Sequence, residues 1–355
     1  MFDRIGADEY EQVVFCHDRA TGLRAIIAIH STRLGPALGG CRFYDYPNED
    51  DALEDVLRLA RGMTYKSAAA GLDLGGGKAV ILGDPAKVKT EALVRAFARY
   101  VGALGGRYCT AEDVGTNQAD MDLMRRETPY VTGVSPSLGG SGDPSPVTAR
   151  GVLHAMRAVS EFLDGDTSLA GRRVVVLGVG KVGSVLVRHL VDEGARVTVA
   201  DVDRAAVQRL VAEFGVGAVA VDLAHTVECD VFSPCAMGAT LNARTIAALR
   251  CRAVAGAANN QLATEADVGR LAERGIVYAP DFICNAGGVI NIAEELTGYD
   301  QARALRNVER IQETTATVLR SAAAEGISTE AAAERVAERR IAAMSSVKLI
   351  RPAGI

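Results

Sequence analysis

The N-terminal part of the chain alternates between short apolar runs and segments with helical spacing of apolar side chains. Two apolar runs within residues 12–30 flank the polar turn DRATG, which predicts a β-hairpin. Residues 50–65 and 90–104 place apolar side chains three and four positions apart, so each should form an amphipathic helix. The apolar runs at 79–83 and 107–116 predict a short buried strand and a strand that leads into a loop.

Beyond residue 172 the pattern becomes a regular alternation of apolar strands and helices. Residues 172–203 have the pattern of a strand, a tight turn, a helix and a second strand. Four later apolar runs end in small or polar residues: GVGAVAVD, CDVFSPCA, CRAVAGAANN and GIVYAPDF. This order is typical of a doubly wound parallel sheet with helices on both faces. From about residue 302 the spacing is helical.

A segment rich in Gly, Pro and Ser at residues 135–147, SPSLGGSGDPSPV, separates these two patterns and predicts a crossover between domains. The chain has 355 residues, more than one hydrophobic core usually holds, so two domains are expected.

Composition and charge exclude several classes of protein. The formal net charge is −5 and no basic stripe is present, which argues against nucleic-acid binding. No run of about 18 apolar residues predicts a membrane span, and the first residues, MFDRIGADEYEQ, lack the basic-then-apolar pattern of a signal peptide. The seven cysteines are scattered, which favours reduced thiols in the cytoplasm. The five histidines lack the spacing of metal ligands, so no metal is expected.

Lysine is rare in this chain, which makes its positions informative. Only six of the 39 basic residues are lysines, and Lys78 follows three glycines in GLDLGGGKAVILGDP. A desolvated lysine can lose its proton, whereas arginine cannot, so Lys78 is a candidate base. A phosphate-binding P-loop is excluded here, because Leu72 and Ala79 stand where it needs Gly and Ser or Thr.

The hexamer GVGKVG has the spacing and the context of a dinucleotide-binding turn. Gly178, Gly180 and Gly183 follow the strand RRVVVLG and open a helix, whose free N–H groups suit a pyrophosphate. Asp201 ends the next strand 23 residues after Gly178, where a carboxylate accepts from a ribose 2′-OH and disfavours a 2′-phosphate. NAD is therefore expected as cofactor. The turn also contains two variable positions, Lys181 and Val182, of which Lys181 is expected to be solvated.

Three further segments surround a polar side chain with small residues. GPALGGCR carries Arg42, MTYKSA carries Lys66, and TAEDVGT carries Glu112 and Asp113. With Lys78, these residues suit a site that binds a carboxylate and moves a proton. One lysine would stay charged and bind the anion, the other would act as base, and Asp113 would orient it.

Eight segments in the same order along nearly the whole chain resemble those of the glutamate/leucine/phenylalanine/valine dehydrogenase family. They are GPALGGCR, MTYKSAAAGLDLGGGKAV, TAEDVGT, GGSGDPSPVTA, GVGKVG, SPCAMGA, AGAANNQL and YAPDFICNAGGVIN. The resemblance is closest to the leucine dehydrogenase branch, with valine enzymes next. It implies an α/β substrate domain with a mixed sheet at 1–135, an NAD-binding Rossmann domain at 136–325, and C-terminal helices at 326–355 that pack back on the first domain.

The resemblance also implies a reaction: an L-amino acid gives its α-hydride to NAD⁺, and the imine is hydrolysed to a 2-oxo acid and ammonium. Lys66 would bind the substrate carboxylate, Lys78 would be the base that activates water, and Asp113 would assist proton transfer at the amino group. The glycines beside Lys78 would let the backbone crowd the reacting carbon. The other implied substrate contacts are Leu38, Gly40, Ala111, Asn260, Val289 and Ile292. The other implied cofactor contacts are Thr148, Cys235, Ala236 and Asn285.

Two positions bear on the substrate. Leu38 stands where the glutamate branch carries a lysine for the side-chain carboxylate, so glutamate is disfavoured. Ile292 replaces the usual valine of leucine dehydrogenases, which could shift preference towards valine. Cys41 replaces the family's usual threonine and would remove a hydroxyl close to the substrate backbone.

Several alternatives stay open at this point. A valine- or phenylalanine-preferring relative and a catalytically silent NAD-binding protein remain, while a hydroxy-acid dehydrogenase would need a catalytic histidine that the chain does not offer. The family makes dimers and octamers, so a homo-oligomer is expected. The preferred amino acid and the catabolic or biosynthetic role stay undetermined.

Overall fold

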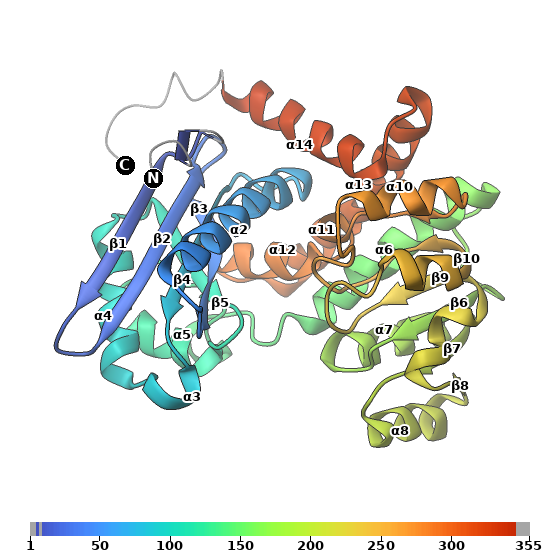
Figure 1. Ribbon diagram of the computed structural model, residues 1–355, viewed down its shortest axis with the longest axis horizontal. Helices are drawn as coiled ribbons and strands as arrows, with labels where there is room; N and C mark the ends of the chain where they lie inside the picture. The colour runs from blue at the N-terminus through green and yellow to red at the C-terminus, as the bar shows by residue number, and fades with distance from the viewer. Residues whose placement is uncertain (1–4, 7–8, 346–355) are drawn as a thin grey trace. The chain divides into compact units, whose positions relative to one another are not determined.

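The computed structural model describes residues 5–6 and 9–345, which form two compact units (Figure 1). Within the described residues, unit 1 holds the chain up to Asp143, the segment Asn291–Gln301, and the chain from Ala337 on. Unit 2 holds Pro144–Ile290 and Ala302–Val336. Three crossings of the chain therefore connect the units, in addition to the predicted crossover at 135–147.

Unit 1 is built on a mixed five-stranded sheet with the order β1-β2-β4-β3-β5. Strands β1 and β2 form the predicted hairpin, β2 also pairs antiparallel with β4, and β3 lies parallel between β4 and β5. The strands are β1 (Gln12–Asp18), β2 (Leu23–Ser31), β3 (Ala37–Tyr44), β4 (Gly75–Leu82) and β5 (Tyr108–Glu112). The expected mixed sheet is thus confirmed, with β3 as an additional strand that the glycine-rich segment did not predict.

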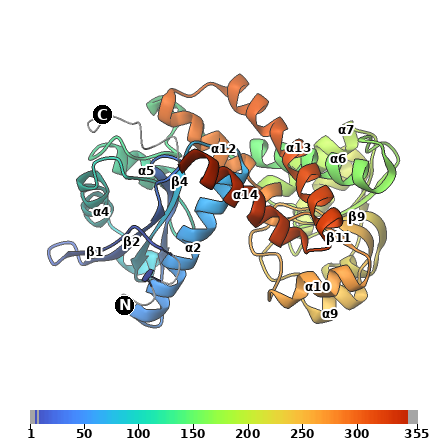
Figure 2. The ribbon, with the colours of Figure 1, turned by 90° about the horizontal axis from the view of Figure 1, so that it is seen from above.

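Helices cover both faces of this sheet, because side chains along each strand alternate between the faces (Figure 2). Helix α2 packs on one face over Ile26, Ala28 and Val80. Helix α4 packs on the other face over Ile27 and Ile81. Both begin at side-chain caps, Asn48 and Thr90. The helices of this part are α2 (Glu49–Ala69), α3 (Pro85–Val88), α4 (Glu91–Ala103), α5 (Gln118–Arg125) and the 3₁₀ turn η1 (Pro136–Leu138).

Unit 2 is a doubly wound sheet whose six strands are all parallel, in the order β11-β10-β9-β6-β7-β8. The strands are β6 (Arg173–Leu177), β7 (Arg196–Ala200), β8 (Gly217–Ala218), β9 (Glu228–Pro234), β10 (Arg250–Val254) and β11 (Val277–Tyr278). The helices before and between them are α6 (Ser145–Asp164), α7 (Lys181–Asp192), α8 (Arg204–Phe214), η2 (Val221–Thr226), α9 (Ala243–Ala248) and α10 (Ala266–Glu273). Figure 2 shows α6 and α7 on one face and α9 and α10 on the other, the arrangement that the sequence predicts.

The remaining elements follow the last strand. They are α11 (Asp281–Cys284), α12 (Gly287–Ala293), η3 (Glu294–Thr297), α13 (Gln301–Glu325) and α14 (Thr329–Ser345). The end of α14 belongs to unit 1, where Arg340 donates to the carbonyl oxygen of Gly71 at 2.9 Å and to Asp73 at 2.7 Å. The helical C-terminal part therefore returns to the first unit, as expected.

The division into units differs from the expected ranges 1–135, 136–325 and 326–355, because the short segment Asn291–Gln301, which begins in the last turn of α12, also belongs to unit 1. Glu295 of this segment accepts backbone hydrogen bonds from Gly133 and Ser141, each at 2.9 Å, and a bond from the Ser141 hydroxyl at 2.6 Å. One carboxylate thus fixes the end of unit 1 that precedes α6. Glu295 lies more than 150 residues after Gly133 and Ser141, so the sequence alone did not indicate this contact.

Across residues 5–6 and 9–345, no helix combines the length and the apolar character that a membrane crossing requires.

Candidate active site

Lys78 and Asp113 lie in direct contact in unit 1. Lys78 is only 5% exposed on β4, and its Nζ donates to Oδ2 of Asp113 in the loop after β5. Oδ1 of the same carboxylate accepts from Nε of Arg42 at 2.9 Å and from the backbone N–H of Val114 at 2.7 Å. Two residues predicted to handle protons are therefore brought together, and Arg42 completes an ion-pair cluster around one carboxylate.

The two cations keep Asp113 ionised. Burial alone would raise the pKa of the Asp113 carboxyl, but the charges of Lys78 and Arg42 outweigh burial and lower the pKa to about 2. Burial also opposes the charge of Arg42, but Asp113 and Asp55 raise the pKa of its guanidinium. The cluster therefore holds a permanent carboxylate between two positive charges.

Strand alternation places the predicted substrate residues of unit 1 on the face that carries this cluster. Parallel pairing sets Gly40 on β3 beside Ala111 on β5, and a Cβ on Gly40 would lie 2.9 Å from Cβ of Asp113. Leu38, two residues before Gly40, is fully buried, and Ala111 is 2% exposed. An apolar floor thus lies next to the charged cluster.

Packing of the protein itself explains the glycines before Lys78. A Cβ on Gly76 would lie 2.0 Å from the backbone nitrogen of Thr64 in α2, and one on Gly77 would lie 2.8 Å from the ring of Tyr108. These glycines therefore let α2 and Tyr108 approach β4 closely. The expectation that they also let the backbone approach the reacting carbon stays a prediction. The close approach brings the last turn of α2, with the half-buried Lys66, beside the strand that carries Lys78.

Cys41 points away from this site. It is fully buried in the core with Phe43, Ala79 and Ile81, on the opposite face of the sheet from Lys78. Burial raises the pKa of its thiol well above the ordinary value. The expectation that position 41 offers a group close to the substrate backbone is therefore wrong, because alternate residues of a strand face opposite sides.

The three glycines of the turn in unit 2 have two different structural roles. A Cβ on Gly178, whose φ is +100°, would lie 2.6 Å from the backbone nitrogen of Ala236, and a Cβ on Gly183 would lie 2.0 Å from the carbonyl oxygen of Gly178. A Cβ on Gly180 would meet nothing within 4 Å. The first and third glycines thus serve the packing of the turn, while the second leaves open space over the start of α7, as a bound pyrophosphate requires.

Asp201, directly after β7, supports this turn from the neighbouring strand. Its Oδ2 accepts from the backbone N–H of Val179 at 2.6 Å, and its Oδ1 accepts from that of Asp203 at 2.8 Å. A carboxylate has about four acceptor sites, so it can accept a ribose hydroxyl as well. Inside the turn Lys181 is exposed and Val182 is half-buried. The residues present therefore fit a dinucleotide.

The other predicted cofactor residues gather beside this turn and around the start of α6. Cys235 and Ala236 follow β9, and Cβ of Cys235 would lie 3.5 Å from a Cβ on Gly183. Thr148, in the first turns of α6, donates from Oγ1 to the carbonyl oxygen of Pro144 at 3.0 Å. A Cβ on Gly288 would lie 2.9 Å from the same Oγ1, so the NAGG segment lies against Thr148.

Asn285 and Asn260 have different environments although both lie in asparagine motifs. Asn285 is 5% exposed, and its Nδ2 donates to the carbonyl oxygen of Ala257 at 3.2 Å and to Oδ1 of Asn259 at 2.8 Å. Asn260 is exposed and has a left-handed backbone with φ of +50°. In this structure Asn285 orders the loop that presents Asn260. The remaining pocket candidates lie on α12, where Val289 is buried and Ile292 is half-buried.

Residues that the sequence did not single out complete the unit 1 cluster. Asp55, on α2, accepts from Nη1 of Arg42 at 2.8 Å, from the hydroxyl of Tyr46 at 2.6 Å and from Nη2 of Arg58 at 2.9 Å. Asp55 lies among ordinary helix residues in LEDVLRL, with no motif to distinguish it. Only the contact with Arg42 reveals it.

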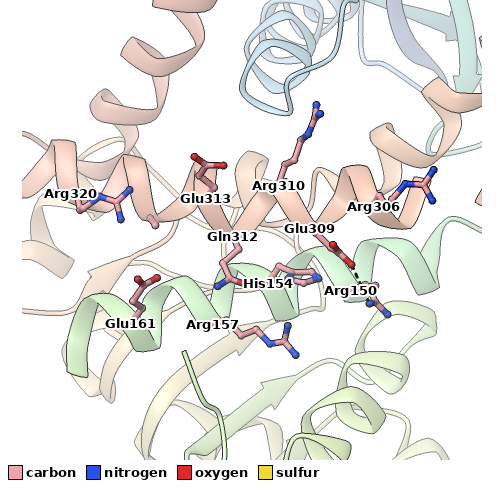
Figure 3. A pocket seen from close by; sticks show the side chains of 11 residues that line it. Arg150, His154, Arg157, Glu161, Arg306, Glu309, Arg310, Gln312, Glu313 and Arg320 are labelled. Atoms are coloured by element: carbon pink, nitrogen blue, oxygen red, sulfur yellow. Dashed lines mark hydrogen bonds and ion pairs between the residues drawn. The ribbon is translucent and has the colours of Figure 1, made fainter. Parts of the chain in front are cut away.

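A separate cavity of about 740 Å³ in unit 2 has no such organisation (Figure 3). Arginine and glutamate side chains of α6 and α13 line it, and Arg157 and Arg310 point away from each other. Arg157 pairs with Glu193 and Arg150 lies 3.6 Å from Glu309, so these charges serve contacts within the unit. No group of three or more His, Cys, Asp or Glu side chains suited to a metal ion occurs in the part of the chain that the structure describes.

Family models match both halves of the chain. The family model of the Glu/Leu/Phe/Val dehydrogenase dimerisation domain matches residues 10–130, and the Glutamate/Leucine/Phenylalanine/Valine dehydrogenase model matches residues 139–210 and 202–350. Leucine dehydrogenase from Bacillus cereus is 53% identical over 346 residues, which cover 98% of this chain and 94% of that protein. Valine dehydrogenase from Streptomyces virginiae is 52% identical over 335 residues, with 94% of each chain covered.

A solved structure agrees with the arrangement of the chain. L-tryptophan dehydrogenase from Nostoc punctiforme superimposes with a TM-score of 0.89 at 40% sequence identity. The alignment covers 98% of this chain and 100% of that one.

Proposed function

Because the chain belongs to the glutamate/leucine/phenylalanine/valine dehydrogenase family, we propose that it catalyses the reversible, NAD-dependent oxidative deamination of a branched-chain L-amino acid. L-Leucine is the first candidate substrate, and valine and isoleucine are further ones. The observation that carries the proposal is the cluster of buried Lys78 with half-buried Asp113 and Arg42 beside an apolar floor, in a chain 53% identical to a leucine dehydrogenase.

The proposed division of labour in unit 1 follows from charge and burial. Lys66, half-buried at the end of α2, would bind the substrate carboxylate as a cation. Lys78, as the amine, would take a proton from the water that attacks the imine carbon. Asp113, held ionised, would stabilise the ammonium that results and would assist transfer at the substrate nitrogen.

The dinucleotide would be held in unit 2 by the turn around Gly180, the start of α7 and the carboxylate of Asp201. Thr148, Cys235, Ala236 and the loop ordered by Asn285 would complete this binding surface. When bound, the nicotinamide supplies the acceptor for the α-hydride. The carboxylate of Asp201 would repel a 2′-phosphate, which supports NAD over NADP.

An apolar substrate side chain is supported by the character of the candidate pocket residues. Leu38 and Ala111 are buried and uncharged, so a second carboxylate would be left unpaired, at a cost of about 2 kcal/mol or more. Valine is the second candidate because Ile292 adds about one methylene to the expected pocket and because valine dehydrogenases are 52% identical to this chain.

We further propose a homo-oligomer, a dimer or an octamer, since the model that matches residues 10–130 describes a dimerisation domain. The seven cysteines are free thiols, which supports the cytoplasm as location.

The test is a panel of kcat/KM values for L-leucine, L-valine, L-isoleucine, L-phenylalanine and L-glutamate, each with NAD⁺ and with NADP⁺, followed by NADH or NADPH absorbance. We expect branched-chain substrates with NAD⁺ to exceed glutamate by at least about 100-fold. Equal or greater rates with glutamate, or with NADP⁺, would refute the corresponding part of the proposal.

A further inference from the structure

Arg42 holds Asp113 in one orientation. Its Nε and the Val114 backbone N–H both bind Oδ1, at 2.9 and 2.7 Å, so Oδ2 is the oxygen left to face Lys78. Arg42 therefore helps to determine which oxygen meets the lysine and, together with Lys78, it lowers the pKa of the carboxylate.

Asp55 holds the other end of the same guanidinium. It accepts from Nη1 of Arg42 at 2.8 Å, and it is itself bound by the Tyr46 hydroxyl and by Arg58. The side chains of Arg42 and Asp55 are 21% and 16% exposed, so water screens this pair only in part. The chain of contacts runs from Lys78 through Asp113 and Arg42 to Asp55.

This series of side-chain contacts cannot carry a proton past Arg42. A guanidinium keeps its proton at any pH that the protein meets, and contact with Asp113 and Asp55 raises the pKa of Arg42 further. Arg42 can act only through its charge and its geometry, and Asp55 acts only through Arg42.

We propose that Arg42 and Asp55 are positioning residues for the deamination: Arg42 fixes the orientation and charge of Asp113 opposite Lys78, and Asp55, clamped by Tyr46, fixes Arg42. The inference rests on the proposed function, since it assigns Asp113 and Lys78 to proton handling. Neither Arg42 nor Asp55 contacts the substrate in this scheme, so they affect turnover rather than substrate affinity.

The test compares Arg42→Ala, Arg42→Lys and Asp55→Asn with Arg99→Ala, which removes an exposed arginine of α4 that pairs with Glu127. We expect Arg42→Ala to lower kcat about 100-fold with little change in the KM for L-leucine, because misplacing a reacting group by about 1 Å has that effect. Guanidinium at millimolar concentration should restore part of the rate to Arg42→Ala, whereas sodium at equal ionic strength should not. The kcat of Arg42→Lys should lie between that of wild type and that of Arg42→Ala.

Asp55→Asn keeps the size of the side chain and serves if Arg42→Ala does not fold. It should lower kcat about 10-fold and leave the KM within about twofold, on the same physical ground. Rates within twofold of Arg99→Ala for both variants, or a folded Arg42→Ala that guanidinium does not restore, would overturn the proposal.

A readout without turnover separates this inference from the proposed function. Without Arg42, the pKa of Asp113 should move up from about 2 towards its ordinary value, so wild type and Arg42→Lys should lose more stability than Arg42→Ala as the pH falls from about 4 to about 2. If wild type oxidises none of the amino acids tested, the proposed function fails, while this comparison still measures the coupling of Arg42 to Asp113. An equal loss of stability in all three proteins would contradict the coupling.

Discussion

The candidate sites of the two units differ in what forms them: paired charged side chains in unit 1 and exposed backbone in unit 2. In unit 1 they are charged side chains whose bonds are already made: both oxygens of Asp113 are occupied, and Lys78 is almost completely buried. In unit 2 the central feature is backbone with nothing beside it, since a Cβ on Gly180 would meet no atom within 4 Å. One region is fixed by electrostatics within the protein, and the other leaves open backbone where we propose that a dinucleotide binds.

The difference predicts how each region responds to change. Substitution in the unit 1 cluster leaves a charge without its partner, so turnover and stability at neutral pH should both fall. Substitution at the open position of the glycine turn should leave the fold intact and affect only binding.

The largest effect is expected from Lys78→Arg, which keeps the charge but removes the ability to accept a proton. Turnover of L-leucine, measured from NADH formation, should fall about 1,000-fold, as loss of a general base does. Lys87→Arg is the matched control, because Lys87 is an exposed lysine that pairs with Asp84. A Lys78→Arg enzyme with near-normal turnover would show that Lys78 is not the base.

The glycine turn offers a paired test of its two kinds of glycine. Gly183→Ala should destabilise the protein by about 1–3 kcal/mol, because its Cβ would lie 2.0 Å from a backbone oxygen. Gly180→Ala should leave the thermal midpoint unchanged but weaken NAD⁺ binding about 10-fold or more, a loss of about 1.4 kcal/mol. Calorimetry and titration of the cofactor separate the two outcomes. Equal destabilisation by both substitutions would remove the distinction between packing glycines and the ligand-facing glycine.

The smallest effect is the acid sensitivity that Asp113 contributes. Its pKa is about 2 in the folded protein and should be near 3.8 in the unfolded chain, so its ionised form stabilises the fold above pH 4. About 1–2 kcal/mol of stability should be lost as the pH falls from about 4 to about 2. Asp113→Asn should show a shallower loss over that range in chemical unfolding. A slope equal to wild type would mean that the two cations do not hold this carboxylate ionised.

The same contrast explains how much the sequence could predict. The turn around Gly178 and Gly180, together with Asp201, could be predicted from the sequence. Its backbone conformation and close contacts require glycines at a fixed spacing. The strand β3 was not readable from GPALGGCR, because it has few of the apolar β-branched residues that mark strands, although parallel pairing on both sides makes it central. Which face a side chain takes depends on that pairing, and so the place of Cys41 was misjudged.

Contacts between distant segments were the other limit. Lys78 and Asp113 were singled out by their small neighbours, but Asp55 has ordinary helical neighbours and was found only through its contact with Arg42. Helical spacing predicts that Asp55 lies on α2. It does not predict which strand this helix covers.

The carboxylate of Glu295 has a consequence for the order of biosynthesis. It closes the end of the N-terminal unit through Gly133 and Ser141, yet it is translated only after the whole parallel sheet of the second unit. The sheet of unit 2 can therefore form on the ribosome before the N-terminal unit is complete. A nascent chain stopped before residue 295 would carry all the strands of both sheets, but both units would still lack C-terminal segments.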